Sequence, residues 1–151
     1  MRVVLQRVSE AAVSVGGESV ASIGPGFLAL VGVEVGDTVR DAHALATKVA
    51  GLRVFADGDG RFNVALSDIR GSVLVVSQFT LLADVRRGRR PSFSRAAAPP
   101  DAEPLVDRFA SDLRDAGMEV STGVFGATMQ VSLINDGPVT LVIDASDGNV
   151  T

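Results

Sequence analysis

Residues 3–33, VVLQRVSEAAVSVGGESVASIGPGFLALVGV, determine the class of fold. The spacing of apolar residues predicts strands over Val3–Val15, Glu18–Ile23 and Phe27–Val33. Short glycine-rich turns separate the three segments, at Gly16-Gly17 and at Gly24-Pro25-Gly26. Consecutive strands joined by such short turns pair antiparallel, so this stretch predicts the start of an antiparallel sheet.

Two helices are expected further along the chain. Asp37 or Thr38 caps the first, which runs to about Ala50 and is ended by Gly51. Asp101 is expected to cap the second, with Pro104 in its first turn, and Gly117 closes it. In both segments the apolar residues recur at helical spacing, which indicates that each helix covers a core with one face.

The remaining apolar runs predict six more strands. They are Leu52–Phe55, Phe62–Leu66, Ser72–Val76, Val120–Val124, Met129–Ile134 and Val139–Ile143, and the tail after Ala145 is expected to be frayed. This pattern predicts an α+β fold with a mixed, largely antiparallel, barrel-like sheet and two main helices. A doubly wound nucleotide fold is not expected, because neither a GxGxxG segment after a strand nor a Walker sequence is present.

Composition narrows the classes of function. A length of 151 residues with 46% hydrophobic side chains fits a single globular domain over residues 1–151. The absence of cysteine excludes disulfides and thiolate chemistry, and the single histidine argues against a histidine metal site. No apolar run is long enough for a membrane span, and the N-terminus does not resemble a signal peptide, so the cytosol is the expected compartment.

The net charge of −4 argues against a surface that binds polyanions all over, but one stretch is basic. Between Ala83 and Pro100 the chain is long, punctuated by proline and rich in arginine: Arg86, Arg87, Arg89, Arg90 and Arg95. Such a local patch can bind a phosphate backbone while the acidic remainder limits non-specific binding. A solvated loop without function explains the same run equally well.

Ser77-Gln78-Phe79-Thr80 is the first segment that could carry chemistry, because an apolar strand ends there in two hydroxyls and an amide. By strand alternation Ser77 and Phe79 would share one face, and Gln78 and Thr80 the other. A nucleophilic hydroxyl needs a base, and no histidine, lysine or carboxylate lies nearby in the sequence. Backbone N–H groups could still stabilise an oxyanion on a labile ester. Alternatively, the hydroxyls only satisfy local backbone groups at the strand end.

Asn135-Asp136-Gly137-Pro138-Val139-Thr140 is the second such segment. Gly137 tolerates any backbone angle and Pro138 cannot donate a ladder hydrogen bond, so a plain hairpin between Ile134 and Leu141 is the simplest interpretation. A cis Gly-Pro bond would aim two neighbouring carbonyls in nearly the same direction. Such a pair could hold a substrate ammonium group and leave no room for a side chain on one face.

Other polar or aromatic residues give weaker signals. Phe125 and Met129, beside Gly123 and Gly126, could line a pocket for a flat base or could belong to the core. His43 is expected to be a surface or packing residue of the first helix. A calcium loop around Asp57 and Asp59 is not expected, since the later ligands are missing.

These residues together resemble the D-aminoacyl-tRNA deacylases, over nearly the whole chain. The two segments from Ser77 to Leu81 and from Asn135 to Thr140 are similar to that family's two signatures, in the right order and spacing. Three further stretches are also similar. They are residues 1–8 (MRVVLQRV), Arg90–Phe93, and Gly123–Ala127 together with Met129. Arg89 departs from the pattern, which has an uncharged polar residue there.

The resemblance implies an ester hydrolase that removes D-amino acids, and also glycine, from the 3′-terminal adenosine of mischarged tRNA. It implies a homodimer with active sites at the interface, and neither a cofactor nor a metal ion. Gly137 and Pro138, through a cis peptide, would act in the partner's pocket and read the chirality of the α-carbon by main-chain contacts. Asn135, Val139 and Thr140, in the same segment, would belong to the substrate-binding residues.

The resemblance also implies roles for the remaining site residues. Ser77, Gln78, Phe79 and Thr80 would form the catalytic floor, with either Thr80 or the substrate 2′-hydroxyl assisting attack. The missing base favours the 2′-hydroxyl. Phe125 and Met129 would contact the terminal adenosine, and Arg7 would fix the Gly-Pro loop. Two alternatives stay open: an editing enzyme with a trans Gly-Pro that acts on L-aminoacyl-tRNA, and a non-catalytic RNA-binding protein.

Overall fold

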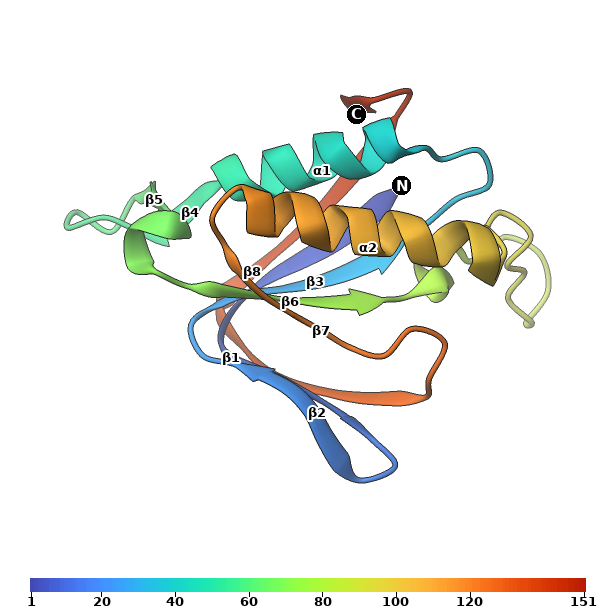
Figure 1. Cartoon of the computed structure of the whole chain (residues 1–151), viewed down its shortest axis with the longest axis horizontal. Coiled ribbons are helices and arrows are strands. Elements are labelled where there is room, and N and C mark those ends of the chain that lie inside the picture. Colours follow the sequence, from blue (N-terminus) through green and yellow to red (C-terminus); the bar gives the residue numbers. More distant parts are fainter.

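In the computed structural model, which describes residues 1–151, two helices cover one face of a strongly curled sheet (Figure 1). The seven-stranded sheet has the order β7-β6-β3-β1-β8-β9, and β2 pairs with β1 beside this path. Its strands are β1 (Arg2–Val15), β2 (Glu18–Ile23), β3 (Gly26–Gly32), β6 (Ser72–Ser77), β7 (Glu119–Thr122), β8 (Met129–Ser146) and β9 (Asn149–Val150). A separate two-stranded ribbon consists of β4 (Arg53–Ala56) and β5 (Phe62–Ala65). The predicted α+β class is confirmed.

The sheet is mixed because its connections differ in length. Strand β1 pairs antiparallel with β2, β3 and β8, as the short glycine turns predicted for the first two. Strand β6 runs parallel to both β3 and β7. Parallel neighbours need long crossovers, and the connections from β3 to β6 and from β6 to β7 contain the two helices.

Helix α1 (Val39–Gly51) begins as the sequence predicted. Thr38 is its N-cap, and the Thr38 N–H donates to Asp41 Oδ2 at 2.7 Å. Burial of Asp41 raises the pKa of its carboxyl. The N–H groups of Gly148 and Thr38 and the Thr38 hydroxyl donate to that carboxyl and outweigh the burial, so that its pKa falls below the usual value. The capping carboxylate therefore stays charged while it is buried.

Helix α2 (Pro99–Asp115) begins earlier than predicted. Ala98, not Asp101, is the N-cap, and Pro99 and Pro100 occupy the first helical positions. Proline is tolerated there because the first N–H groups of a helix have no intrahelical acceptor. Asp101 lies in the first turn, where the positive end of the helix dipole stabilises its negative charge. Gly117, with a φ of +85°, ends the helix as expected.

Strand β8 corrects the prediction around Gly137. Instead of two strands joined by a hairpin, Met129–Ser146 is one strand that pairs with β1 on both sides of an irregularity. Gln6 is opposite Thr140 and Val8 is opposite Asn135, so several residues of β8 bulge out against one residue of β1. The Gly-Pro pair therefore interrupts the ladder without reversing the chain.

Two clusters of buried residues lie on the two sides of the sheet. Phe27, Leu45 and Phe109 belong to the larger one, between the sheet and the helices. Val13 and Leu74 belong to the smaller one, inside the curl formed by β1, β2 and β8. The sheet curls around this second core, toward the predicted barrel-like shape (Figure 1).

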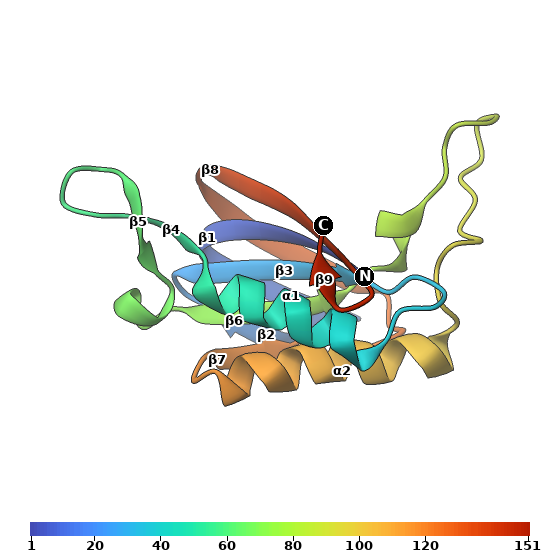
Figure 2. The same ribbon diagram turned by 90° about the horizontal axis from the view of Figure 1, so that it is seen from above.

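The end of the chain is ordered, contrary to the expected fraying. Strand β9 turns back on β8, where Asn149 pairs with Ser146 and Val150 with Ala145. The two ends of the chain lie near each other beside α1 (Figure 2). None of the helices combines the length and the apolar character that a membrane crossing requires.

Candidate active site

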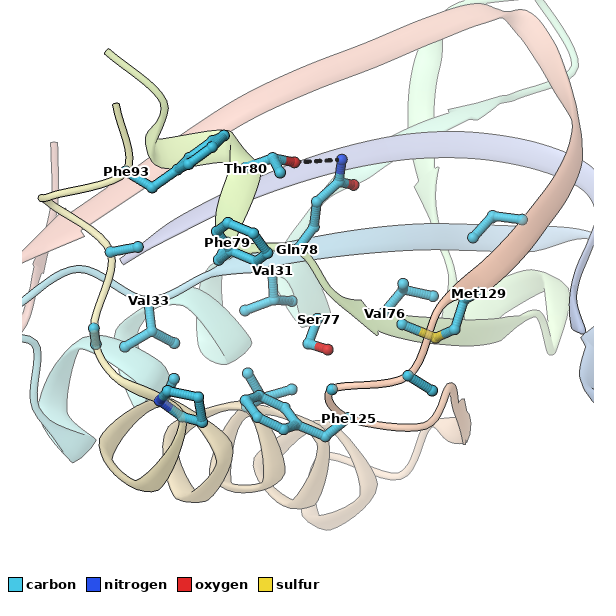
Figure 3. A pocket seen from close by; sticks show the side chains of 18 residues that line it. Val31, Val33, Val76, Ser77, Gln78, Phe79, Thr80, Phe93, Phe125 and Met129 are labelled. Atoms are coloured by element: carbon cyan, nitrogen blue, oxygen red, sulfur yellow. Dashed lines mark hydrogen bonds between the residues drawn. The ribbon is translucent and has the colours of Figure 1, made fainter. Parts of the chain in front are cut away.

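A cavity of about 660 Å³ lies at the carboxyl ends of β3 and β6, beside the first turns of α2 (Figure 3). Its size is in the range of small-molecule sites. It brings together residues from β3, β6, the loop before α2, the loop after β7 and the start of β8. The lining residues are Val31, Val33, Val76, Ser77, Gln78, Phe79, Thr80, Phe93, Ala96, Ala97, Pro99, Ala102, Val106, Phe125, Gly126, Ala127, Met129 and Val131.

The segment Ser77–Thr80 forms the floor of this cavity because β6 ends inside it. The N–H of Gln78 donates to the carbonyl of Val31 at 2.7 Å, and the chain then enters a 3-10 helix, η2 (Phe79–Leu82). The predicted alternation of faces therefore stops at Gln78. A Cβ on Gly32 would lie 3.1 Å from the Gln78 carbonyl oxygen, so glycine permits this close approach.

The polar side chains of the floor are few and specifically placed. Ser77 is half-buried and its hydroxyl points into the cavity (Figure 3). The side-chain amide of Gln78 donates to the Thr80 hydroxyl at 3.0 Å, which fixes the orientation of Thr80 at the rim. None of the lining residues is ionisable, so the site contains no general base for either hydroxyl.

The backbone supplies what the side chains lack. Phe79 and Thr80 are the first residues of η2, and the first N–H groups of a helix have no acceptor within it. Such N–H groups are the usual donors of an oxyanion hole. The arrangement can stabilise the negative charge of a tetrahedral ester intermediate, while the attacking oxygen must come from the substrate or from water.

An ion pair near the end of η2 holds it against the sheet. Arg2 in β1 donates to Asp144 in β8 at 2.7 Å and to the Leu81 carbonyl at 3.4 Å. The hydrogen bond from Arg2 lowers the pKa of the Asp144 carboxyl and raises that of the Arg2 guanidinium. One charged contact thus connects the first strand, the last long strand and the segment that forms the floor of the cavity.

Phe125 and Met129 both line the cavity, as one of the two open interpretations predicted. They lie across from Ser77, one in the loop after β7 and the other at the first position of β8 (Figure 3). Phe125 also packs against the larger core and Met129 against the smaller one. These two residues therefore line the cavity and also pack against the core.

Four lining residues come from the long basic segment, where they were not predicted. Phe93 packs edge-on against Phe79 with 5.0 Å between ring centroids, and Ala96, Ala97 and Pro99 continue the wall. Ala97 donates to the Val33 carbonyl at 2.9 Å, which ties this wall to the chain just after β3. An isolated phenylalanine in a polar stretch was the only sequence signal.

The Gly137–Pro138 segment lies outside the cavity. Its peptide bond is cis and exposed, and Gly137 has a φ of +138°. Asn135 bridges the bulge: its side-chain oxygen accepts from the Val139 N–H at 2.9 Å and its amide donates to the Thr140 hydroxyl at 3.0 Å. Asn135, Val139 and Thr140 therefore shape the bulge from within the chain and do not line the cavity.

Arg7 holds the same bulge from β1. Its Nε donates to the Asp136 carbonyl at 2.9 Å, and its Nη1 donates to the Val54 carbonyl. The guanidinium lies over the rings of Phe55 and Phe62, at 5.8 and 5.4 Å from their centroids. The contact expected between Arg7 and the Gly-Pro loop is thus present, and the β4–β5 ribbon supports it.

The sheet register separates the bulge from the cavity of its own chain. Arg7 pairs with Phe27, whereas the cavity wall contains Val31, four residues further along β3. At the rise of a strand this spacing is about 13 Å. The structure thus forms two groups of predicted site residues, one around Ser77 and one around Gly137, that do not meet within one chain.

The residues expected to have no function lie apart from both groups. His43 is exposed on α1 and its Nδ1 lies 3.0 Å from Asp112 Oδ2. Asp57 Oδ1 accepts from the N–H groups of Asp59 at 2.9 Å and of Arg61 at 3.0 Å, which is ordinary turn geometry. No group of three or more His, Asp or Glu side chains is arranged to hold a metal ion.

Comparison with known proteins gives a consistent result. Residues 4–144 match the model of the family described as D-Tyr-tRNA(Tyr) deacylase. The chain is 61% identical over 146 residues to a D-aminoacyl-tRNA deacylase of Roseiflexus sp. (strain RS-1), with 97% of this chain and 94% of the relative covered.

Solved structures show the same fold. One of a c-Myc DNA Unwinding Element Binding Protein superposes with a TM-score of 0.89 at 37% identity, covering 97% of this chain and 99% of the other. Another, of "a probable eukaryotic D-amino acid tRNA deacylase", superposes with a TM-score of 0.76 at 21% identity, covering 95% of this chain and 98% of the other.

Proposed function

Because the chain belongs to the D-Tyr-tRNA(Tyr) deacylase family, it is a hydrolase of ester bonds, and we propose how it selects and cleaves its substrate. Its reaction is the hydrolysis of D-aminoacyl-tRNA to a free D-amino acid and tRNA. The proposal adds that glycine on a mischarged tRNA is also removed, and that a second copy of the chain completes each site. The cytoplasm is the compartment that this substrate implies.

The observation that carries the proposed chemistry is a cavity with hydroxyls and free backbone N–H groups but no ionisable side chain. An aminoacyl ester is already activated, so stabilising its oxyanion accounts for a large share of the rate enhancement. The N–H groups of Phe79 and Thr80 take that role in the proposal. The substrate's ribose 2′-hydroxyl or a bound water supplies or activates the attacking oxygen, since no side chain can accept its proton.

The open side of the cavity receives the terminal nucleoside. Phe125 and Met129 offer an aromatic ring and a polarisable sulfur opposite Ser77, which suits the face of an adenine. The ester bond then lies over the floor, at the Ser77 hydroxyl and the start of η2. The amino-acid moiety points toward the rim, beside Thr80.

Selection by chirality is proposed to occur in trans. The bulge at Gly137 is exposed, is held rigidly by Arg7 and Asn135, and cannot reach the cavity of its own chain. In a symmetric dimer the partner's Gly137 and Pro138 would close the rim over the α-carbon. Main-chain atoms on that side leave room for a hydrogen and not for an L side chain. A D side chain points the other way, and glycine has none.

Apolar side chains on the outer side of the sheet support such a dimer. Val142 is 63% exposed and Ile134 is 54% exposed, both on β8, which also carries the bulge. Two-fold symmetry pairs the same surface on both subunits, so a bulge from each chain can enter the other's cavity. A monomeric mass in solution would contradict this part of the proposal.

The deciding experiment compares hydrolysis of the same tRNA carrying a D-amino acid, the matching L-amino acid or glycine. The proposal predicts fast cleavage of the D and glycyl esters and none of the L ester above the rate in buffer. If the L ester is cleaved and the D ester is not, the L-specific alternative is correct. If no ester is cleaved faster than in buffer, the enzymatic proposal fails. The trans Gly137–Pro138 peptide that would favour the L-specific alternative is not observed.

A further inference from the structure

The basic segment between η2 and α2 forms an arm that projects from the body of the molecule (Figure 2). We name residues Asp84–Ser92 the arginine loop. Two backbone hydrogen bonds close its base, from the Asp84 N–H to the Ser92 carbonyl at 2.7 Å and from the Ser92 N–H to the Asp84 carbonyl at 2.9 Å. The loop is therefore a defined projection with a fixed base.

The arginines of this segment fall into two groups. Arg86 donates to Asp84 at 2.9 Å, and Arg95 donates to Glu34 at 2.7 Å, so both are committed to ion pairs within the chain. Arg87, Arg89 and Arg90 are exposed. They take part in none of the salt bridges or side-chain hydrogen bonds of the segment, which use Arg86 and Arg95 instead. Three unpaired cations thus gather at one tip of a chain whose net charge is −4.

The base of the arginine loop is continuous with the cavity wall. Phe93, one residue after the loop, packs against Phe79 of the catalytic floor at 5.0 Å between ring centroids. Arg89 and Arg90 precede Phe93 by four and three residues, a reach of at most about 14 Å of extended chain. A nucleic acid whose end lies in the cavity can therefore come within reach of these guanidinium groups.

We propose that Arg87, Arg89 and Arg90 bind the phosphates of the nucleotides that precede the 3′-terminal adenosine of the tRNA. This inference rests on the proposed function, and it assigns the binding of the RNA backbone to the arginine loop. Guanidinium groups form paired hydrogen bonds with phosphate oxygens, and such contacts position a nucleic acid without reading its sequence. The acidic remainder of the surface repels RNA, so the loop fixes the direction from which the acceptor end arrives.

The test is the salt dependence of binding and cleavage in a triple variant, Arg87→Gln, Arg89→Gln and Arg90→Gln. Each phosphate contact makes the slope of log affinity against log salt more negative by about 0.7–0.9. The triple variant should therefore show a slope for tRNA that is smaller in magnitude by about 2–3. The single variant Arg89→Asn should lower it by about 1. The matched control removes the same number of positive charges from the helical layer, by replacing Arg40, Lys48 and Arg114 with glutamine. Its slope should equal that of the original chain.

A short substrate separates this inference from the proposed function. The triple variant should hydrolyse the 3′-ester of a D-amino acid with adenosine as fast as the original chain, since that ester lacks the preceding phosphates. An unchanged slope in the triple variant, an equal fall in the control, or slow cleavage of the short ester would each overturn the inference. Failure of the original chain to cleave either D ester would instead overturn the proposed function.

Discussion

Replacing Gly137 with alanine tests the proposed filter most directly. Gly137 has a φ of +138°, a region that side chains rarely adopt. A Cβ there would lie 2.8 Å from Val139 Cγ2 and 3.0 Å from Arg7 Nη2. Neither neighbour is free to move without loss, because Val139 is buried and Arg7 holds the Asp136 carbonyl.

The structure indicates the size of the effect. A residue held in such a backbone region costs about 1–3 kcal/mol. Domains of this size are stable by about 5–15 kcal/mol, so the variant should still fold, and the bulge should relieve the strain by moving. A displaced bulge loses its fit to the α-carbon. If the whole strain energy is lost from the discrimination between the two esters, the ratio of D to L cleavage falls by about 5- to 150-fold.

The assay measures kcat/KM for the same tRNA carrying the D- or the L-amino acid. Gly17→Ala is the matched control, because Gly17 also has a positive φ, of +88°, but a Cβ there meets no atom within 4 Å. It should lower stability without changing selectivity. Full D activity together with full rejection of the L ester in Gly137→Ala would refute the filter.

Three other perturbations separate the roles of individual side chains. Thr80→Ala should lower the single-turnover rate of D-ester cleavage by less than about 100-fold, which is the smallest rate loss typical of removing an acid–base group. A larger loss would identify Thr80 as the nucleophile. In Arg7→Lys, the lysine lacks the planar guanidinium that holds the Asp136 carbonyl. The D-to-L ratio of kcat/KM should therefore fall, while cleavage of the glycyl ester persists. Unchanged selectivity would show that Arg7 does not contribute to the filter. The Arg2 hydrogen bond lowers the folded pKa of Asp144, so that the folded state binds fewer protons than the unfolded chain. The stability from this pair should be complete above the unfolded pKa of about 3.9 and be lost as pH falls through the lower folded value. Urea unfolding at neutral and acid pH should show this loss, and Asp144→Asn should lack it.

Local patterns were sufficient for much of the fold. Alternation and glycine turns predicted β1 to β3, and the capping residue Thr38 predicted the start of α1. The start of α2 was misplaced because an aspartate is the stronger local signal. Pro99 and Pro100 start the helix without a capping side chain, because proline has no N–H that would be left unpaired there.

The course of β8 could not be read locally. Gly137-Pro138 breaks a strand by every short-range rule, and only pairing with β1 on both sides makes Met129–Ser146 one strand. That pairing is between residues more than a hundred positions apart, which no local pattern reports. The apolar run after Pro138 is a strand, as its pattern predicts, but its continuity with Met129–Ile134 depends on that distant pairing.

The candidate site was predictable in its residues but not in its arrangement. The floor at Ser77–Thr80 and the wall at Phe125 were identified as candidates, and the structure brings them together. The separation of Gly137 from that cavity depends on sheet register, which sequence patterns do not fix across distant strands. Phe93 was missed as a lining residue because an aromatic residue in a basic loop has no periodic context.

Strand β8 carries both groups of site residues on one continuous backbone, with Met129 at its start and Gly137 in its bulge. In the proposed dimer each chain contributes its floor to one site and its bulge to the other. Two chains with different single defects, Gly137→Ala in one and a damaged floor in the other, would then assemble one intact site out of two. Co-expression of two such impaired genes should restore part of the D-selective cleavage that neither supplies alone, whereas a site built from one chain would show no such complementation.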